Sequence, residues 1–302
     1  MEVITSHVNA DLDTLASMIA VAKLYPSARL VFSGSVDKKV KEALQTFSLP
    51  CKFERMRDFA PELSSVTKLI LVDVKDPSRI GHFSEIIAKP GVDVHIYDHH
   101  MAASGGIKPV FCVIEPYGST TTVLVHILRA KNIGVTPVEA TVLMAGIYED
   151  TGSLSYPSTT VKDYEAASFL LSSGADLNAV GGLLKRELTS GELSALNEFL
   201  HSETIYTAGA ATVAIAEGRL EKSSGDVASL AHRIREIKGH DCVFVLADAG
   251  DRIHMAARSA TADVDAGSVA RALGGGGHPM AASATLKDVT LVQAKERLIT
   301  AI

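Results

Sequence analysis

The first half of the chain alternates short apolar runs with segments whose apolar residues recur at helical spacing. The runs at 3–5, 29–33, 69–72 and 92–97 have the length of buried strands. Helical spacing predicts helices over 12–24, 36–47, 83–88, 119–131, 137–149, 161–172 and 176–188. Strands that alternate with helices favour a parallel β-sheet with helices on both faces. We therefore expect an α/β domain over residues 1–188.

The pattern changes after about residue 190. A helical segment at 192–201 is interpreted as a linker helix, with residues 189–203 joining two domains. Beyond it the spacing predicts strands at 211–216, 242–247 and 253–259 and helices at 226–238 and 289–301. A turn at 249–251 makes the last two strands a hairpin. These elements predict a smaller α/β domain with a mixed sheet over 204–302, and the closing helix suggests a piece of a longer protein.

Composition narrows the class of protein. Hydrophobic residues make up 47% and charged residues 21% of the 302 positions, which is enough to bury a large core. No apolar run is long enough to cross a bilayer and no signal peptide is visible, so a soluble cytoplasmic protein is expected. The three cysteines form no C-x-x-C pair, which argues against a disulfide framework or a zinc site.

Charge and aromatic content limit the partners. The net charge of −6 argues against tight binding to long duplex nucleic acid, although it allows a local basic pocket for a short anion. Tryptophan is absent and aromatics are 5%, so a broad base-stacking platform is not expected.

Acidic and histidine side chains follow three of the predicted strands. Ligands of open parallel sheets bind beyond the carboxyl ends of the strands, so these side chains are expected at one edge. Carboxylates placed so close together repel one another unless cations hold them. Nitrogen and oxygen donors suit manganese, iron, zinc or magnesium, and two such ions can activate a hydroxide for attack on phosphorus. The candidates are His7, Asp11 and Asp13 after the first strand, Asp73, the run Asp98-His99-His100, and Asp150 near a helix end.

Each of these residues alone also has an ordinary structural interpretation. An aspartate after a strand often caps a helix or a turn. Asp11 and Asp13 could complement a helix dipole, and Asp150 could cap a turn with Gly152. The combination, in this order and at strand ends, favours a metal site.

The chain resembles the DHH phosphoesterase superfamily in four ordered motifs. These are H-x-N-x-D-x-D at 7–13, the lone Asp73, Asp-His-His at 98–100, and Asp150 before Thr151-Gly152. Ala10 stands where many relatives have proline. In the second domain, Arg258-Ser259, the glycines 274–277, His278 and Ala281-Ala282 resemble the first type of DHH-associated C-terminal domain. That domain occurs in oligoribonucleases, cyclic dinucleotide phosphodiesterases and RecJ-like exonucleases, and not in family II pyrophosphatases.

The resemblance implies roles for the first domain. Two divalent ions are expected, Mn²⁺ with Mg²⁺ as the alternative, and Asp73 would bridge them. His100 would face the substrate phosphate, and Asp98 would orient ligands. Asn9 would either do the same or form a turn. One ion would be held by His7, Asp11 and Asp73, and the other by Asp13, Asp73, His99 and Asp150.

The resemblance also implies substrate contacts in the second domain. Arg258 would pair with a phosphate as a planar fork, beside Ser259, unless it is a surface arginine. Gly275, Gly276 and Gly277 would let backbone N–H groups approach an anion, unless they form a flexible turn. His278 would bind phosphate or base, and the substrate would lie in a cleft between the domains with the linker as hinge. The catalytic residues expected are Asp73, His100 and Arg258.

A second resemblance concerns residues 1–7 and 24–32. They are similar to the DHH module that is fused to CBS domains and a tRNA nucleotidyltransferase of the poly(A) polymerase type. The first hypothesis is a metal-dependent hydrolase acting on short single-stranded RNA or DNA, or on a nucleotide such as 3′-phosphoadenosine 5′-phosphate. The alternatives are a cyclic dinucleotide phosphodiesterase and a nucleotide- or RNA-binding module of a larger tRNA nucleotidyltransferase. No membrane partner is expected, and a homodimer is left open.

Overall fold

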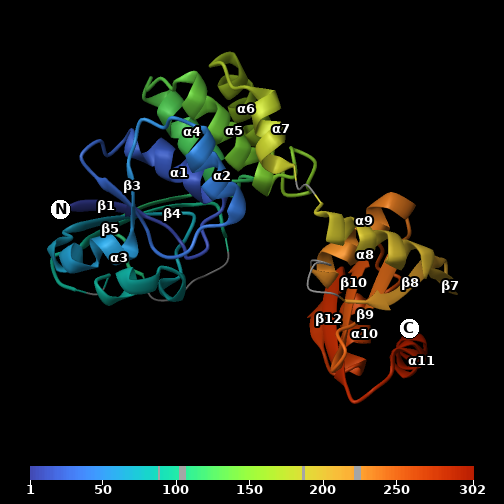
Figure 1. The fold of residues 1–302 in the computed structure, drawn as a ribbon. Helices are drawn as coiled ribbons and strands as arrows, with labels where there is room; N and C mark the ends of the chain where they lie inside the picture. Colours follow the sequence, from blue (N-terminus) through green and yellow to red (C-terminus); the bar gives the residue numbers. More distant parts are fainter. Residues whose placement is uncertain (88, 102–106, 186–187, 221–225) are drawn as a thin grey trace. The chain divides into compact units, whose positions relative to one another are not determined.

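The structure, a computed structural model, describes residues 1–87, 89–101, 107–185, 188–220 and 226–302. Its internal contacts divide the chain into two compact units, Met1–Arg186 and Glu187–Ile302 (Figure 1). Each unit has its own sheet and its own core. The expected α/β class with two sheets is confirmed.

The first unit is built on a six-stranded sheet in the order β3-β2-β1-β4-β5-β6. Every neighbouring pair in it is parallel, so all six carboxyl ends lie at one edge. The four strands expected from apolar runs are present, whereas the two edge strands were not predicted. Both edge strands are short and only partly buried, so they lack a continuous apolar run. The bounds are β1 (Glu2–Thr5), β2 (Arg29–Phe32), β3 (Phe53–Arg55), β4 (Lys68–Val72), β5 (Asp93–Asp98) and β6 (Phe111–Ile114).

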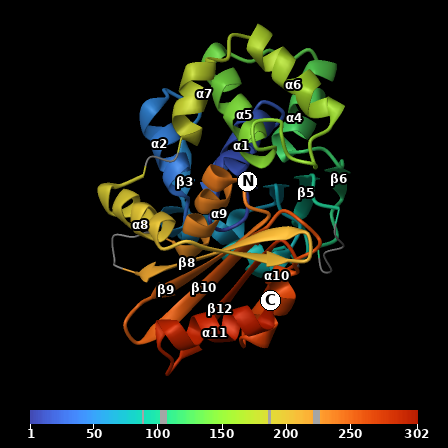
Figure 2. The same ribbon diagram turned by 90° about the vertical axis from the view of Figure 1, so that its right-hand side faces the viewer.

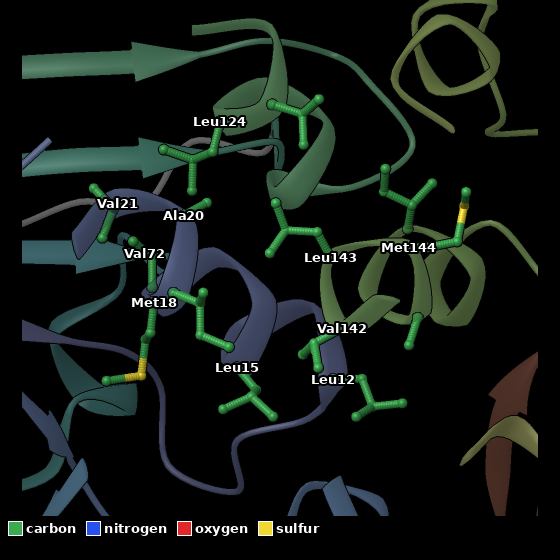
Figure 3. Packing of buried hydrophobic residues seen from close by; sticks show 14 of the residues in the cluster. Leu12, Leu15, Met18, Ala20, Val21, Val72, Leu124, Val142, Leu143 and Met144 are labelled. Atoms are coloured by element: carbon green, nitrogen blue, oxygen red, sulfur yellow. The ribbon is translucent and has the colours of Figure 1, made fainter. Parts of the chain in front are cut away.

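One face of this sheet is covered by long helices. Figure 3 shows Leu12 and Leu15 of the first helix on the side of Val142 of a later one, whereas Met18 lies beside Val72 of the sheet. These side chains are buried at apolar positions of helical spacing, which is why the sequence signal for these helices is strong. The helices are α1 (Leu12–Ala22), α2 (Lys38–Thr46), α4 (Thr120–Ala130), α5 (Pro137–Asp150), α6 (Val161–Ser172) and α7 (Leu177–Leu184).

The other face is covered by short helical turns. Phe59, Ile80 and Phe83 pack there against Leu69 and Leu71 of β4. The helix expected at 83–88 is instead a 3-10 helix, and residue 88 lies outside the described residues. Residues 186 and 187, expected at the end of a helix, also lie outside them. The covering elements are α3 (Met56–Phe59) and the 3-10 helices η1 (Ala60–Ser65), η2 (Pro77–Arg79) and η3 (Gly81–Glu85).

The second unit contains a mixed six-stranded sheet in the order β11-β12-β10-β9-β8-β7 (Figure 2). Only the β8–β9 pair is parallel among its described strands. The strands β7, β11 and β12 of this sheet were not predicted from the sequence. The bounds are β7 (Thr204–Ala208), β8 (Ala211–Arg219), β9 (Cys242–Asp248), β10 (Arg252–Ser259), β11 (Gly276–His278) and β12 (Ala281–Lys287).

Helices cover both faces of the second sheet. On one face α8 (Ser190–His201) and α9 (Val227–Lys238) pack on the central strands, and on the other lie α10 (Ala266–Ala272) and α11 (Leu291–Ala301). The helix interpreted as a linker is α8. Its Phe199 is fully buried in the core of the second unit, so α8 is part of that unit. None of the described helices has the length and apolar character needed to traverse a bilayer.

Candidate metal centre

The strands β1, β4 and β5 are neighbours in the first sheet, and each is followed by side chains of the expected ligand types. His7 comes two residues after β1, Asp73 directly after β4, and His99 directly after β5. The remaining candidates come from helix ends, namely the start of α1 and the last residue of α5. They are Asp11, Asp13 and Asp150.

Three groups of described side chains are close enough to hold a metal ion. Within each group the donor atoms all lie within 4.8 Å of one another. Asp13 and Asp150, which are 137 positions apart in the sequence (150 − 13), thus meet at one edge of the sheet. The groups are His7 with Asp11 and Asp73, Asp13 with His99 and Asp150, and Asp73 with His99 and His100.

Asp73 lies between the first two groups. Its Oδ2 is 3.3 Å from Nε2 of His7, and its Oδ1 is 3.6 Å from Nε2 of His99. The residue is buried and has a φ of 57°, a left-handed conformation that non-glycine residues rarely adopt. Such conformations persist where the surrounding structure enforces them, often at functional sites. One carboxylate therefore presents a separate oxygen to each histidine.

The other carboxylates complete the two groups. Nε2 of His7 is 3.7 Å from Oδ2 of Asp11. Nε2 of His99 is 3.4 Å from Oδ2 of Asp150. Both histidine nitrogens thus face one carboxylate of their own group in addition to the shared Asp73.

Backbone hydrogen bonds fix which histidine nitrogens face the acidic cluster. Nδ1 of His7 donates to the carbonyl of Val8 at 2.7 Å, and Nδ1 of His99 donates to the carbonyl of Tyr117 at 3.0 Å. A carbonyl only accepts, so Nδ1 carries the proton and Nε2 of the neutral ring is an acceptor; that of His7 lies 2.7 Å from the hydroxyl of Thr14. Nε2 of His99 is buried and has no hydrogen-bond partner among the described residues. An orphaned nitrogen beside two carboxylates fits a metal ligand.

The carboxylates influence one another's protonation. Burial raises the pKa of Asp13 well above its usual range, and the charges of Asp150 and Asp73 add to this effect. Burial and the charge of Asp73 raise the pKa of Asp150 to about 8. Burial also opposes ionisation of Asp73, but its contact with His7 and the charge of His99 outweigh burial and lower its pKa. Crowded buried carboxylates of this kind are stabilised by bound cations, so the donor set fits divalent metals.

His100 lies at the margin of this cluster, with 47% of its side chain exposed. Its Nδ1 donates to Oδ1 of Asp98 at 2.7 Å, and that hydrogen bond raises the pKa of His100. Asp98 is fully buried and also accepts the backbone N–H groups of His99 and His100. Asn9 is exposed, has a φ of 61°, and accepts a hydrogen bond from the hydroxyl of Ser35. Asn9 therefore occupies a turn, one of its two expected roles.

The second unit places its candidates on three neighbouring strands. Arg258 of β10 is opposite Ala281 of β12, which in turn is opposite His278 of β11. Directly opposite residues project from the same face of a sheet, so Arg258 and His278 flank a small alanine on one face. Arg258 forms no ion pair with a described residue, and its Nη1 donates to the carbonyl of Ala257 at 2.8 Å.

The glycines of this unit have a packing role that the sequence did not indicate. A Cβ on Gly275 would lie 2.1 Å from a carbonyl oxygen of β12, and one on Gly277 would lie 2.5 Å from another. Gly276 has open space where a Cβ would be. Part of the segment for which a flexible turn was the alternative is thus β11, and two of its glycines allow the chain to lie against β12. Ser259 is buried, and its hydroxyl donates to the backbone carbonyl two residues further along.

Comparison with known families decides the identity. The model described as "DHH family, N-terminal domain" matches residues 2–147, and the "DHHA1 domain" model matches residues 209–302. The chain belongs to the DHH family. The resemblance inferred from the motifs is thereby confirmed, as is the pairing with the C-terminal domain. Members of the DHH family are phosphoesterases, which include named phosphodiesterases and pyrophosphatases.

Individual relatives of the DHH chain carry different names. It is 47% identical over 299 residues to the A-adding tRNA nucleotidyltransferase of Geobacter sulfurreducens, covering 99% of this chain and 34% of that protein. It is 31% identical over 242 residues to the cyclic-di-AMP phosphodiesterase PdeA of Listeria monocytogenes, covering 78% of this chain and 35% of the relative. The chain thus spans about a third of the length of these curated relatives.

A solved structure shares the fold of the DHH chain. The exopolyphosphatase-related protein from Bacteroides fragilis superposes with a TM-score of 0.73 at 18% identity. The match covers 99% of this chain and 91% of that one. At this identity the likeness supports the two-domain DHH fold.

The DHH domain also contains residues that hydrogen-bond to the candidate ligands and that the motifs did not indicate. The backbone N–H groups of Thr120 and Thr121, at the start of α4, each donate to a carboxylate oxygen of Asp13 at 2.9 Å. The hydroxyl of Thr120 donates to Oδ1 of Asp73 at 2.9 Å, and that of Thr14 lies 2.7 Å from Nε2 of His7 and 3.3 Å from Oδ2 of Asp73. The signal was available in part, because the segment Gly118–Thr122 is rich in hydroxyl residues where a helix begins.

Proposed function

We propose that this DHH-family chain is a hydrolase that holds two divalent cations and cleaves phosphate esters of short oligonucleotides or nucleotides, such as 3′-phosphoadenosine 5′-phosphate. The observation that carries the proposal is the position of Asp73, whose two oxygens face His7 and His99 separately. Divalent cations bound there would activate a water and neutralise charge on the phosphoryl oxygens. We propose Mn²⁺ as the physiological metal, because histidine joins carboxylates in the donor set.

Each of the candidate residues is assigned either to a cation or to a phosphate of the substrate. We assign one cation to His7, Asp11 and Asp73, and the other to Asp13, Asp73, His99 and Asp150. The half-exposed ring of His100, held by Asp98, is assigned to the substrate phosphate. Arg258 is assigned to a second phosphate, with Ser259, Gly275, Gly276, Gly277 and His278 near it. The fork of a guanidinium group suits two phosphate oxygens at once.

A second candidate function has support of its own. The 47% identity to an A-adding tRNA nucleotidyltransferase extends over almost the whole chain. A module that binds nucleotide or RNA for such an enzyme would be compatible with this match. The presence of every expected metal ligand in the three donor groups favours a catalytic role over binding alone. A cyclic dinucleotide is a further substrate candidate, suggested by the 31% identity to PdeA.

A substrate panel tests the proposal. Oligoribonucleotides, cyclic dinucleotides, 3′-phosphoadenosine 5′-phosphate and pyrophosphate are incubated with the chain in Mn²⁺ and in Mg²⁺. We expect metal-dependent hydrolysis of a nucleotide substrate, and its loss in Asp73→Ala with a preserved cooperative melt. Asp93→Ala is the matched control, since this aspartate begins β5 at the opposite end of the same sheet. Binding of RNA without turnover would favour the second candidate, and full turnover by Asp73→Ala would refute the metal assignment.

A further inference from the structure

A cavity of about 1000 Å³ lies in the first unit beside the carboxyl ends of β2 and β3. Its volume is at the upper end of the roughly 300–1,000 Å³ typical of small-molecule sites. The residues that line it include none of the proposed metal ligands. The proposed chemistry therefore leaves this cavity without a role.

The cavity is joined directly to the loop that carries His7 and Asp11. Ser35 and Val36 line the cavity. The backbone N–H of Ala10 donates to the carbonyl of Ser35 at 3.0 Å, and the N–H of Asp37 donates back to the carbonyl of Ala10 at 2.9 Å. The wall of the cavity and the metal loop thus form one hydrogen-bonded unit, so a ligand in the cavity would adjoin the metal centre.

A second contact joins the cavity lining to the loop that carries His7, and it is closely packed. A Cβ on the lining residue Gly34 would lie only 2.9 Å from Cγ1 of Val8. Val8 follows the proposed ligand His7 directly. The loop and the cavity wall are therefore closely packed, with no room for a larger residue than glycine at position 34.

One part of the cavity is aromatic. The rings of Phe32 and Phe53 stack with centroids 5.1 Å apart and an interplanar angle of 14°. Phe32 is buried, whereas Phe53 and Phe47 are only partly buried. Partly open aromatic rings are surfaces on which planar bases stack.

The rim of the cavity is cationic. Lys41, Arg55 and Arg57 line it, on a chain whose net charge is −6. The side chains of Lys41 and Arg55 have no hydrogen bond or ion pair with any described residue, while Arg57 lies 3.4 Å from Asp58. The one carboxylate among the lining residues, Glu54, already accepts hydrogen bonds from Nε and Nη2 of Arg29. Two cations without partners beside an aromatic surface suit an anion that carries a flat apolar ring.

The geometry points to a nucleotide subsite in this cavity, with the base against Phe53 and the phosphate at Lys41 and Arg55. The subsite would receive the nucleotide next to the cleaved bond, and to that extent the inference rests on the proposed function. It predicts that the chain prefers a substrate of at least two nucleotides over a mononucleotide. Discrimination would come from binding, because none of these side chains belongs to the metal centre.

Binding is measured first without metal, so that its outcome does not depend on catalysis. Adenosine 5′-monophosphate and ribose 5-phosphate are titrated calorimetrically in EDTA, also in an Arg258→Ala background that removes the phosphate contact proposed in the second unit. We expect Lys41→Ala and Arg55→Ala each to weaken nucleotide binding about tenfold, the loss of one charge-assisted contact. Lys38→Ala is the control, since this lysine belongs to the same helix and its side chain is 88% exposed outside the cavity. Unchanged affinity in both cavity variants would overturn the inference.

The base is tested separately from the phosphate. Phe53→Leu removes the ring but keeps an apolar side chain, and a thermal melt reports whether the fold survives. We expect this variant to lose affinity for the nucleotide while its affinity for ribose 5-phosphate stays the same. An equal effect on both ligands would show that the base does not lie against Phe53.

Kinetics then separates this inference from the proposed function. For a dinucleotide substrate we expect Lys41→Ala and Arg55→Ala to raise KM about tenfold with little change in kcat. Hydrolysis of bis(p-nitrophenyl) phosphate, which has no base, should be unchanged. If the unmodified chain hydrolyses neither substrate, the proposed function fails, while the binding titrations still decide the fate of the cavity. If it hydrolyses both and the variants keep their KM, the subsite fails alone.

Discussion

At the scale of single residues, the proposed metal centre contains hydroxyl groups that hydrogen-bond to its acidic side chains. The buried hydroxyl of Thr120 donates to Oδ1 of Asp73, the oxygen that faces His99. A hydrogen bond of this kind orients a ligand and reduces its freedom before metal binds. The positions of the ligands are therefore set by groups that never touch the metal.

This dependence leads to a prediction for Thr120→Val. The substitution keeps the shape of the side chain and removes the donor, so the metal affinity should fall about 10–100-fold. Thr120→Ser, which retains the hydroxyl, should stay close to the unmodified chain. Metal titration followed by the rate of hydrolysis measures both variants. Equal affinity in the valine and serine variants would contradict a role for the hydroxyl.

The sequence indicated the candidate ligands more readily than the residues that hydrogen-bond to them. His7, Asp73 and His99 could be predicted because they directly follow apolar runs, which places them at one edge of a parallel sheet. Thr120 could not, because a hydroxyl residue at the start of a helix is ordinarily a cap, and here Ser119 is the cap. Whether its neighbour reaches Asp73 depends on how α4 packs, which the local sequence does not encode.

At the scale of secondary-structure elements, one buried acid fixes the start of two helices. Asp163 in the first turn of α6 accepts hydrogen bonds from the backbone of Thr160 and of Gly118, and from the hydroxyls of Thr160 and Thr122. Gly118 immediately precedes the cap of α4, the helix whose N–H groups hold Asp13. Asp163 thus positions the metal centre indirectly, by fixing α4.

We predict that Asp163→Asn destabilises the first unit by about 2–3 kcal/mol. The amide would replace an acceptor with a donor among groups that themselves donate, and hydrogen bonds to a buried charge contribute about 1.5–3 kcal/mol. Urea denaturation measures the loss, with the exposed Asp58→Asn as control. The proposed support of α4 would be wrong if both variants unfolded at the same urea concentration.

The contact between α1 and α5 should make the stability of the first unit depend on pH. Lys23, at the end of α1, donates to both oxygens of Glu139 at 2.7 and 2.9 Å, and Glu139 also accepts the N–H of Thr136. Burial opposes ionisation of Glu139, but these hydrogen bonds outweigh it and lower its pKa. A lowered pKa in the folded state stabilises the fold above the unfolded pKa of 4.5, and this contribution disappears as pH falls below it.

The measurement is the difference in unfolding free energy between the unmodified chain and Glu139→Gln. We expect the unmodified chain to be the more stable near neutral pH and the difference to shrink as the pH falls from about 5 to about 3. Lys162 and Glu165 form an exposed pair of the same charge type, and Glu165→Gln is the control that should show little difference. A difference that stays constant over this range would exclude a special role for Glu139.

The secondary-structure elements that could be predicted from the sequence are the ones that are buried. Central strands such as β4 are buried on both faces and give unbroken apolar runs, so they were predicted. Edge strands such as β6 and β11 are partly exposed, and β11 consists mainly of glycine. The local sequence of α8, interpreted as a linker helix, also does not reveal that it packs into the core of the second unit. A single helix between two domains has the same local pattern whether it spans a gap or packs on one of them.

At the scale of the whole molecule, the two units have separate cores and unequal shares of the proposed chemistry. Every candidate metal group found among the described residues lies in the first unit. The second unit contributes Arg258 and His278 but no such group in its described part. Metal binding should therefore stabilise one unit directly and leave the other as it is.

Hydrogen exchange measured by mass spectrometry can follow the two units separately. A ligand that binds only the folded state stabilises it by about 2.7 kcal/mol at a concentration 100 times its Kd. With Mn²⁺ at such a concentration we expect slower exchange in peptides that contain His7, Asp73 or Asp150, and unchanged exchange in residues 226–302. Asp73→Ala should abolish the protection, because one carboxylate serves both proposed ions. Protection that extended equally to the second unit would mean either that metal also binds there or that the units unfold as one. Repeating the experiment on residues 188–302 alone distinguishes these, since only bound metal would protect that fragment.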